Sequence, residues 1–394
     1  MKRRSKFPLK QILLVMALVL AGVMIFNSGV LVDIGVLKGN IPEDIGIVEN
    51  DPRVIPKEEG ELNKEGVQKT IDTVISWITG KVPQGEIKIV TKDAAKGFML
   101  SGFKYEIRDA VSDTVIETVI SDAQGLSLSK PLNYRMAYKV VQIETAEPYN
   151  TSETEIVFEM KAPTVELHFD QTTPSHILGY ELNEDGTVTV KEAKVDVPLI
   201  LQKPELPNGC EITAVTSVLN YYGYDVDKIT LSDNFLPKLP FYRSGGKLYG
   251  ADPEKAFSGD PRDAGGWFVY APPTVKAAQD YVDSVGGKHK VVDVTGSTSA
   301  QIMDYVLAGR PVAIWATRDL SLANYGYGWY LDGTETYFEA ATNLHCMVIY
   351  GFVDNQLYVM DPLEGNMVYD QAQFFASYES LGSRAIVIEE PAHE

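Results

Sequence analysis

The first part of the chain carries one long run of apolar side chains. It extends from Ile12 to Phe26 and resumes at residues 30–32, after Asn27, Ser28 and Gly29. About 20 apolar residues cross the hydrocarbon core of a bilayer, so residues 1–35 are predicted to form a basic cytoplasmic tail and a transmembrane anchor. A cleaved signal peptide is the alternative, but no small-x-small cleavage site closes the run. Five basic side chains precede the run, a bias that favours a cytoplasmic N-terminus and an exported remainder: Lys2, Arg3, Arg4, Lys6 and Lys10.

Residues 36–84 lack a sustained hydrophobic period at first and then acquire a helical one. Residues 36–65 contain Pro42, Pro52 and Pro56 among many charges, a composition typical of a spacer. A short amphipathic helix is expected after it, because apolar residues recur at intervals of three to four: Val67, Ile71, Val74, Ile75 and Ile78.

Residues 85–172 alternate apolar and polar side chains in short segments separated by turn residues. This period of two is typical of half-buried strands, and the number of segments predicts a small β-sandwich. The segments are EIKIVTK, FKYEIRD, TVIETVIS, MAYKVVQIE and TEIVFEM.

The order of these segments resembles the prealbumin-like repeat domains of Gram-positive surface proteins, through LSGFKYEIRD, SDAQG and YKVVQIETAEPYN. In many such domains a Lys of the first strand forms an isopeptide bond with an Asn or Asp of the last strand, assisted by a buried Glu. Lys92, Glu144 and Asp170 occupy comparable places. The final segment reads VELHFDQ and lacks the usual Asn, so three surface charges on an ordinary sandwich are the simpler interpretation.

Residues 173–394 mix helical and strand periods. Helical spacing occurs in 211–222, 273–284 and 299–308, interleaved with the β-rich runs PVAIWAT, LHCMVIYGF, QLYVMD and RAIVIE. Helices that come first and strands that follow predict an α+β fold with a largely antiparallel sheet. The chain as a whole is therefore expected to be multidomain.

Composition narrows the function. The formal net charge of -19 argues against a nucleic-acid partner, because phosphate binding needs a surplus of Lys and Arg. Two cysteines in an exported chain do not make a disulfide framework, although a Cys210–Cys346 bridge is conceivable. The five histidines show no metal-ligand spacing, and no cofactor motif is present, so neither a metal nor a cofactor is expected.

Cys210 is predicted to begin a buried helix. Pro207, Asn208 and Gly209 end an extended stretch, and apolar residues then repeat at helical spacing. Unpaired N–H groups at a helix start stabilise an anion, so the thiol pKa is expected to fall and the thiolate to become a nucleophile. A small buried hydrophobic residue is the structural alternative for a lone cysteine.

Three further residues form a set with this thiol. His345 is the one histidine within a predicted strand of the second domain, and Asp361 ends the next strand, so an antiparallel pair would bring them together. Asp361 would then accept the imidazole Nδ1–H and leave Nε2 to take the thiol proton. Gln202 precedes the helix and is a candidate oxyanion donor together with the Cys210 N–H. A structural histidine, a strand-ending Asp-Pro and a loop glutamine are the alternatives.

The segments PELPNGCE, GGWFVYAPP, LHCMVIYGF and YVMDPLEG resemble the C39-like peptidase family over roughly residues 196–390. The resemblance implies a papain-like fold and thiol-dependent peptide cleavage, with Cys210 as nucleophile, His345 as base, Asp361 as its orienter and Gln202 as oxyanion donor. Glu211 departs from the small or aromatic residue common in papain. Its carboxylate would oppose thiolate formation if it pointed inward, but the next helical residue faces away by about 100°.

Two segments combine glycines with aromatic residues, YGYGWY at 325–330 and GGW at 265–267. They suit a substrate-binding loop or, equally, aromatic packing beneath long loops.

The function expected from these observations is a membrane-anchored extracellular cysteine peptidase, acting on a peptide or protein through a Cys-His-Asp triad and an acyl-enzyme. A catalytically silent surface binding protein and a thiol acyltransferase are the alternatives. No ATP-binding motif such as G-x-x-x-x-G-K-[ST] appears, so leader-peptide processing is not assigned. The substrate and the oligomeric state are not indicated.

Overall fold

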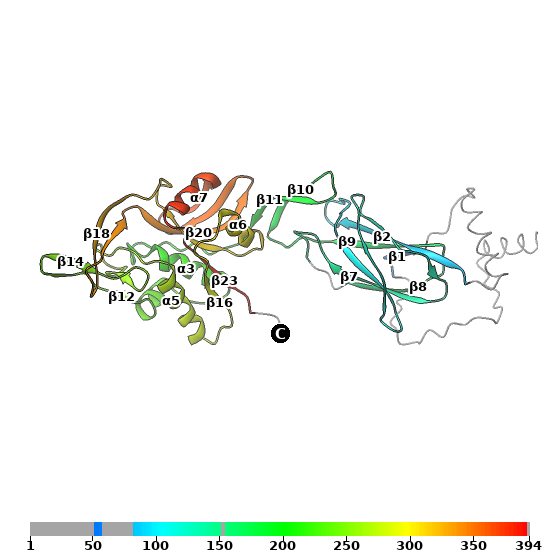
Figure 1. The fold of residues 1–394 in the computed structure, drawn as a ribbon, viewed down its shortest axis with the longest axis horizontal. Coiled ribbons are helices and arrows are strands. Elements are labelled where there is room, and N and C mark those ends of the chain that lie inside the picture. Colours follow the sequence, from blue (N-terminus) through cyan, green and yellow to red (C-terminus); the bar gives the residue numbers. More distant parts are fainter. Residues whose placement is uncertain (1–50, 57–81, 151–153, 392–394) are drawn as a thin grey trace, which may run out of the picture. The chain divides into compact units, whose positions relative to one another are not determined.

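The computed structural model describes residues 51–56, 82–150 and 154–391, which form two compact units (Figure 1). The first unit holds the described residues up to Pro174 together with Leu182–Thr189, and the second holds Ser175–Glu181 and the residues from Val190 onward. The predicted anchor and the predicted helix at 67–78 lie outside the described residues. Within the described ranges, no helix combines the length and apolarity that a membrane span requires.

The first unit is a β-sandwich, as predicted. One sheet has the order β1-β9-β2-β5, with β6 paired to β2, and the other has the order β4-β3-β7-β8. Apolar side chains from alternate positions of both sheets fill the space between them, among them Ile87, Tyr105 and Leu167. The strands are β1 (Val54–Pro56), β2 (Gln84–Asp93), β3 (Lys104–Asp109), β4 (Val115–Ile120), β5 (Leu126–Leu128), β6 (Leu132–Asn133), β7 (Ala137–Glu144), β8 (Glu155–Glu159) and β9 (Thr164–Gln171).

One strand of this sandwich comes from a segment that the sequence predicted to be spacer. Val54–Pro56 forms β1 and pairs antiparallel with β9, with Ile55 opposite Glu166. A three-residue strand at a sheet edge carries too little alternation to be seen as a sequence pattern. Its pairing depends on the exposed edge of β9, which is distant in sequence.

Lys92, Asp170 and Glu144 are surface charges. Lys92 lies opposite Asp170 in the parallel β2–β9 pair, and its Nζ is 3.5 Å from Asp170 Oδ1. The two side chains are 39% and 54% exposed, while Glu144 pairs with Lys104. The buried carboxyl that an isopeptide bond requires is thus not at Glu144, and the simpler interpretation holds.

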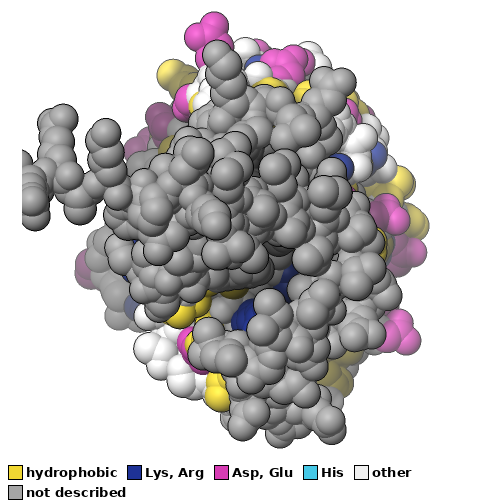
Figure 2. All heavy atoms as spheres, turned by 90° about the vertical axis from the view of Figure 1, so that its right-hand side faces the viewer, with side chains coloured by type: hydrophobic (Ala, Val, Ile, Leu, Met, Phe, Trp, Pro, Cys, Tyr) yellow, Lys and Arg dark blue, Asp and Glu magenta, His cyan; other side chains and the backbone are white. Residues whose placement is uncertain are grey.

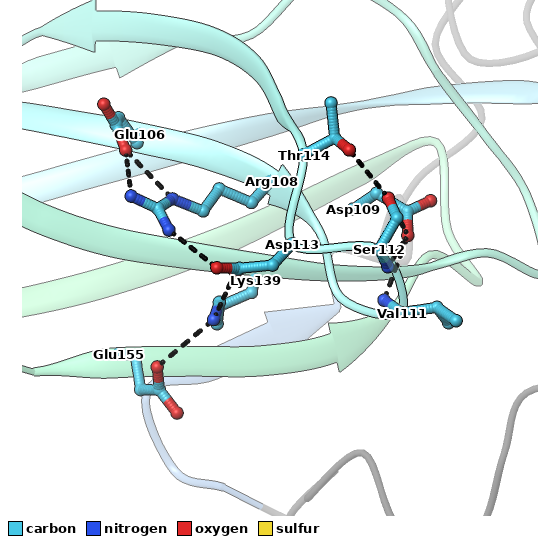
Figure 3. Close-up of polar contacts among 9 residues, drawn as sticks. All are labelled: Glu106, Arg108, Asp109, Val111, Ser112, Asp113, Thr114, Lys139 and Glu155. Carbon is cyan, nitrogen blue, oxygen red and sulfur yellow. Dashed lines mark hydrogen bonds and ion pairs between the residues drawn. The ribbon is translucent and has the colours of Figure 1, made fainter.

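A surface network of charges spans neighbouring strands of the β4-β3-β7-β8 sheet (Figure 3). Arg108 bonds to Glu106 and to Asp113, with Nη1 3.0 Å from Asp113 Oδ2. Lys139 Nζ lies 2.5 Å from Asp113 Oδ1 and 3.7 Å from Glu155 Oε2. Asp113 and Glu155 are more than half exposed and the other three side chains are partly exposed, so these ion pairs contribute little to the stability of the fold. Figure 2 shows acidic side chains at several places around the margin of the face that it draws.

The second unit is an α+β domain built on one large sheet, as predicted. The sheet has the order β10-β11-β20-β17-β23-β16, extended by β21 on β20 and β22 on β21. The pairings of β20 with β11, β17 and β21 are antiparallel, as are those of β23 with β17 and β16. The strands are β10 (Ile177–Leu182), β11 (Val188–Lys194), β16 (Lys290–Asp293), β17 (Val312–Thr317), β20 (Leu344–Val353), β21 (Gln356–Asp361), β22 (Gly365–Asp370) and β23 (Ala385–Glu389).

Helices cover both faces of this sheet. Figure 1 shows α3 and α5 on one side and α7 on the other. Side chains of α3 and α5 share a core with Cys346, Val348 and Tyr350 of β20, which are alternate residues on one face of that strand. The three predicted helices are present within two residues of their expected limits. The helices are α3 (Cys210–Tyr221), α4 (Lys228–Asn234), α5 (Ala271–Ser284), α6 (Ser299–Leu307) and α7 (Gln371–Ser380).

Residues 325–330 form a strand and not a loop, for which the sequence suggested either substrate binding or aromatic packing. They belong to β18 (Tyr325–Leu331), which lies between β14 (Lys247–Gly250) and β19 (Tyr337–Ala341) in a small sheet that β13 (Tyr242–Ser244) completes. Two shorter strands, β12 (Lys238–Leu239) and β15 (Phe257–Ser258), form a separate parallel pair. Trp329 is fully buried, and Tyr327 stacks on Trp267 with ring centroids 4.7 Å apart. Aromatic packing thus accounts for Trp329, whereas Tyr325 and Tyr327 are 46% and 43% exposed.

Candidate active site

Cys210 is the first residue of α3, as predicted. The Thr213 N–H donates to Gly209 O, which opens the helical hydrogen bonds, and no side chain caps the helix start. The turn is tightly packed, because a Cβ at Gly209 would lie only 2.7 Å from Leu206 Cβ. The Asn208 N–H donates to Pro261 O and thereby joins the turn to a loop that is distant in sequence. These contacts place the thiol at the buried start of a helix that packs on β20.

His345 and Asp361 lie on neighbouring antiparallel strands, β20 and β21, and their side chains are in contact. His345 Nε2 is 2.7 Å from Asp361 Oδ1, and both side chains are buried. The pairing of the two residues is the one that the sequence predicted. The ring nitrogen is the opposite one, since Nδ1 was expected to face the carboxylate. Nε2 lies farther from the backbone than Nδ1 and reaches across to the adjacent strand, which leaves Nδ1 as the nitrogen available to a thiol proton.

The Asp361 carboxylate also accepts backbone hydrogen bonds from the turn that follows it. The N–H groups of Leu363 and Glu364 lie 2.7 Å and 3.4 Å from Oδ1. Burial raises the pKa of Asp361, but the hydrogen bond and charge of His345, together with the two N–H groups, outweigh burial and lower the pKa below its ordinary value. Asp361 is therefore ionised at neutral pH.

The Cys210 thiol donates to Glu211 Oε2 at 3.3 Å. Within the described residues, Cys210 Sγ makes no hydrogen bond with the His345 ring, although the thiol lies close enough to Cys346, the residue after His345, to be affected by it electrostatically. Burial, followed by the Glu211 carboxylate, raises the thiol pKa well above its ordinary value. The expected fall of this pKa was wrong, because burial and the adjacent carboxylate outweigh the helix terminus.

Glu211 points into the protein and not away from it. Its side chain is 1% exposed, and Oε1 accepts the Val269 N–H at 3.1 Å. Burial raises the pKa of Glu211 to about 7. The sequence contained one signal for this burial, because Glu211 is the only charged residue in the segment that forms α3. In the structure, the first ten residues of this helix are all buried. A helical wheel cannot show that the loop containing Val269 covers the remaining face of the first turn.

Gln202 is buried and is attached to the turn beyond Asp361. Its backbone N–H donates to Pro362 O at 2.8 Å, and its side-chain Nε2 donates to Pro207 O at 2.7 Å. An amide nitrogen carries two hydrogens, so one donor of Gln202 remains for a ligand. Within the described part of the chain, Gln202 Oε1 has no hydrogen-bond partner and Gln202 makes no hydrogen bond with Cys210.

The described residues contain no group of His, Cys, Asp and Glu side chains suited to hold a metal ion. Cys210 and Cys346 are both free and buried, so the conceivable disulfide between them is not formed. The chemistry available at this site is that of a thiol, an imidazole, two carboxyl groups and a carboxamide.

Comparisons with known proteins assign each of the two units to a family. The Peptidase_C39 like family matches residues 194–386, and the family described as a prealbumin-like fold domain matches residues 85–173. Over 191 residues, the chain is 31% identical to the uncharacterized protein YvpB of Bacillus subtilis, a match that covers 48% of this chain and 72% of that protein. The chain therefore belongs to the C39-like peptidase family, with a prealbumin-like domain ahead of the peptidase-like one.

Two solved structures are similar to separate parts of the chain. One is a putative C39-like peptidase from Bacillus anthracis, with 27% identity and a TM-score of 0.45, covering 50% of this chain and 96% of that one. The other is BcpA, the major pilin subunit of Bacillus cereus, with 16% identity and a TM-score of 0.21, covering 23% of this chain and 30% of that one.

Proposed function

We propose that the chain is a cysteine peptidase in which Cys210 is the nucleophile, His345 the general base and Asp361 its orienting partner. The observation that carries this proposal is the 2.7 Å contact between His345 and Asp361, together with the packing of α3, which begins with Cys210, on β20, the strand of His345. A buried, ionised carboxylate behind an imidazole stabilises the imidazolium that forms when the thiol gives up its proton.

The proposed reaction has two steps. Sγ attacks the carbonyl carbon of the scissile bond while the S–H proton passes to His345 Nδ1, which then protonates the leaving amine. Water hydrolyses the resulting thioester and returns the proton to Sγ. The unused amide hydrogen of Gln202 and the backbone N–H of Cys210 are the proposed donors to the oxyanion.

Digestion of an unbiased peptide library tests this activity. The full-length chain is compared with Cys210→Ala, and both are followed by mass spectrometry of the products. Cys210→Ala should abolish cleavage and labelling by thiol-directed probes without changing the circular dichroism spectrum, and His345→Ala should abolish cleavage likewise. Cleavage that persists in Cys210→Ala would remove Cys210 from the mechanism.

We further propose that the enzyme acts on peptides or proteins outside the cytoplasm and is held to the membrane by residues 1–35. The basic residues ahead of the apolar run and the prealbumin-like domain support this placement. Deletion of residues 1–35 should move the protein from the membrane fraction to the soluble fraction. A membrane-impermeant amine-reactive label should reach the second domain in intact cells, and protection of that domain would contradict the orientation.

A catalytically silent binding protein is a second candidate, favoured by one observation. The Cys210 side chain is 7% exposed, and its thiol is held in the protonated form by burial and by Glu211. Library digestion with no cleavage at any pH, combined with retention of specific peptides by both wild type and Cys210→Ala, would support binding.

An added amine nucleophile separates hydrolysis from acyl transfer, because transfer yields an amide product.

A further inference from the structure

A single buried carboxyl group contacts both the proposed nucleophile and the neighbouring loop. Glu211 Oε2 accepts the Cys210 S–H at 3.3 Å, and Glu211 Oε1 accepts the Val269 N–H at 3.1 Å. The carbonyl of Val269 in turn accepts the indole N–H of Trp315 at 3.1 Å. Glu211 is 1% exposed, so water does not compete for either hydrogen bond.

We propose that Glu211 is a positioning residue that keeps Cys210 protonated in the free protein and holds Sγ on the side of the Val269 loop. A bound substrate would then displace Sγ from its hydrogen bond with Glu211. This inference rests on the proposed function, in which Cys210 must transfer its proton to His345. The thiol can form one strong hydrogen bond as a donor, so the bond to Glu211 and a bond to His345 exclude each other.

The charged and titratable groups around this pair come from three elements. Glu211 belongs to α3, Cys346 and His345 to β20, and Asp361 to β21. Cys346 is a second buried thiol with a raised pKa, to which burial and the Glu211 carboxylate contribute. Asp361 carries a negative charge that is already paired with His345. Glu211 is therefore the carboxylate that acts directly on the Cys210 thiol.

The proton balance of the proposed step is simple. When the bond between Sγ and the carbonyl carbon forms, the S–H bond breaks and the proton goes to His345 Nδ1. Glu211 neither gains nor loses a proton. It loses the S–H donor and keeps the Val269 N–H. Burial raises the pKa of Glu211 to about 7, so above that pH the group is a carboxylate, which accepts the Cys210 S–H and opposes formation of the thiolate.

Glu211→Gln isolates the charge. The amide oxygen can accept the Val269 N–H, and the amide nitrogen donates toward Sγ, so the variant retains the shape and favours the thiolate. Alkylation of the full-length chain by iodoacetamide is measured against pH, with the Cys210 peptide quantified by mass spectrometry against an isotope-labelled copy of the same peptide. We expect the midpoint for Cys210 to fall by at least about one pH unit and alkylation at neutral pH to rise about tenfold.

Glu335→Gln is the matched control, since it removes one negative charge from an exposed position paired with Lys247 in the same unit. It should leave the Cys210 midpoint unchanged. An unchanged or higher midpoint in Glu211→Gln would overturn the proposal, and so would an equal fall in Glu335→Gln. If circular dichroism shows that Glu211→Gln does not fold, Glu211→Met takes its place, because it removes the carboxylate with a side chain of similar length. The Cys210 midpoint should fall in that variant as well, and an unchanged midpoint would refute the proposal.

Alkylation does not depend on turnover, so the proposed function and this inference can fail separately. If Glu211→Gln leaves the alkylation midpoint of Cys210 unchanged while the wild-type chain cleaves peptides, only the role of Glu211 is removed. A confirmed pH effect without any cleavage would remove the peptidase and leave a thiol that Glu211 keeps protonated.

Discussion

Glu211 should make the second unit less stable as pH rises, which is the opposite of the usual behaviour of a carboxyl group. Most carboxyl groups have a lower pKa in the folded state, so their stabilising effect is lost on acidification, as expected for Asp361. Burial instead raises the pKa of Glu211 from 4.5 to about 7. Between these two values the folded state binds more protons than the unfolded state, and the free energy of unfolding therefore falls with increasing pH.

The size of the effect follows from the two pKa values. At about 1.4 kcal/mol per pH unit, the change from 4.5 to about 7 corresponds to about 3 kcal/mol of stability lost. Glu211→Gln does not titrate and resembles the protonated carboxyl in shape. We therefore expect the variant to match wild type at about pH 4.5 and to exceed it by about 3 kcal/mol at about pH 8.

The assay is denaturant unfolding of the full-length chain at a series of pH values, followed by tryptophan fluorescence. Trp267, Trp315 and Trp329 are three of the four tryptophans, and all three lie in the second unit. The difference between variant and wild type cancels the contributions of all other titrating groups, including Asp361. A constant difference across this pH range, or a variant that loses stability relative to wild type as pH rises, would refute a buried Glu211 with a raised pKa.

Three further predictions follow from the site and its surroundings. Asp361→Asn removes the negative charge opposite the His345 imidazolium, and turnover by the proposed peptidase should fall by about 10²–10⁴-fold in steady-state assays, whereas an unchanged rate would exclude the triad. A double-mutant cycle of Trp267→Ala and Tyr327→Ala should give a coupling of about 0.5–1.5 kcal/mol in unfolding, and a coupling of zero would contradict their stacking. Gly209→Ala introduces a Cβ 2.7 Å from Leu206 Cβ, so the free energy of unfolding should fall by at least about 1 kcal/mol and alkylation of the adjacent thiol should decrease. Gly265→Ala, where a Cβ meets no atom within 4 Å, is the control, and an equal effect of both variants would contradict the tight packing.

Local patterns predicted a large part of the architecture. The alternation in 85–172 indicated the sandwich, and the helical periods located α3, α5 and α6 within two residues. The order of His345 and Asp361 on successive strands was enough to predict their contact, because a short turn between antiparallel strands sets the register. Short elements escaped prediction, such as β1 at Val54–Pro56, because three residues contain too little periodicity.

What the sequence by itself determined is the identity and order of Gln202, Cys210, His345 and Asp361, and the helix start at the thiol. Only the tertiary structure decided which nitrogen of His345 faces Asp361, and that Glu211 lies inside, next to Sγ. The physical reason is that the local pattern gives the direction of a side chain from its own helix or strand. The loop at Val269 and the strands β20 and β21, all distant in sequence, determine whether that side chain meets water or a buried partner.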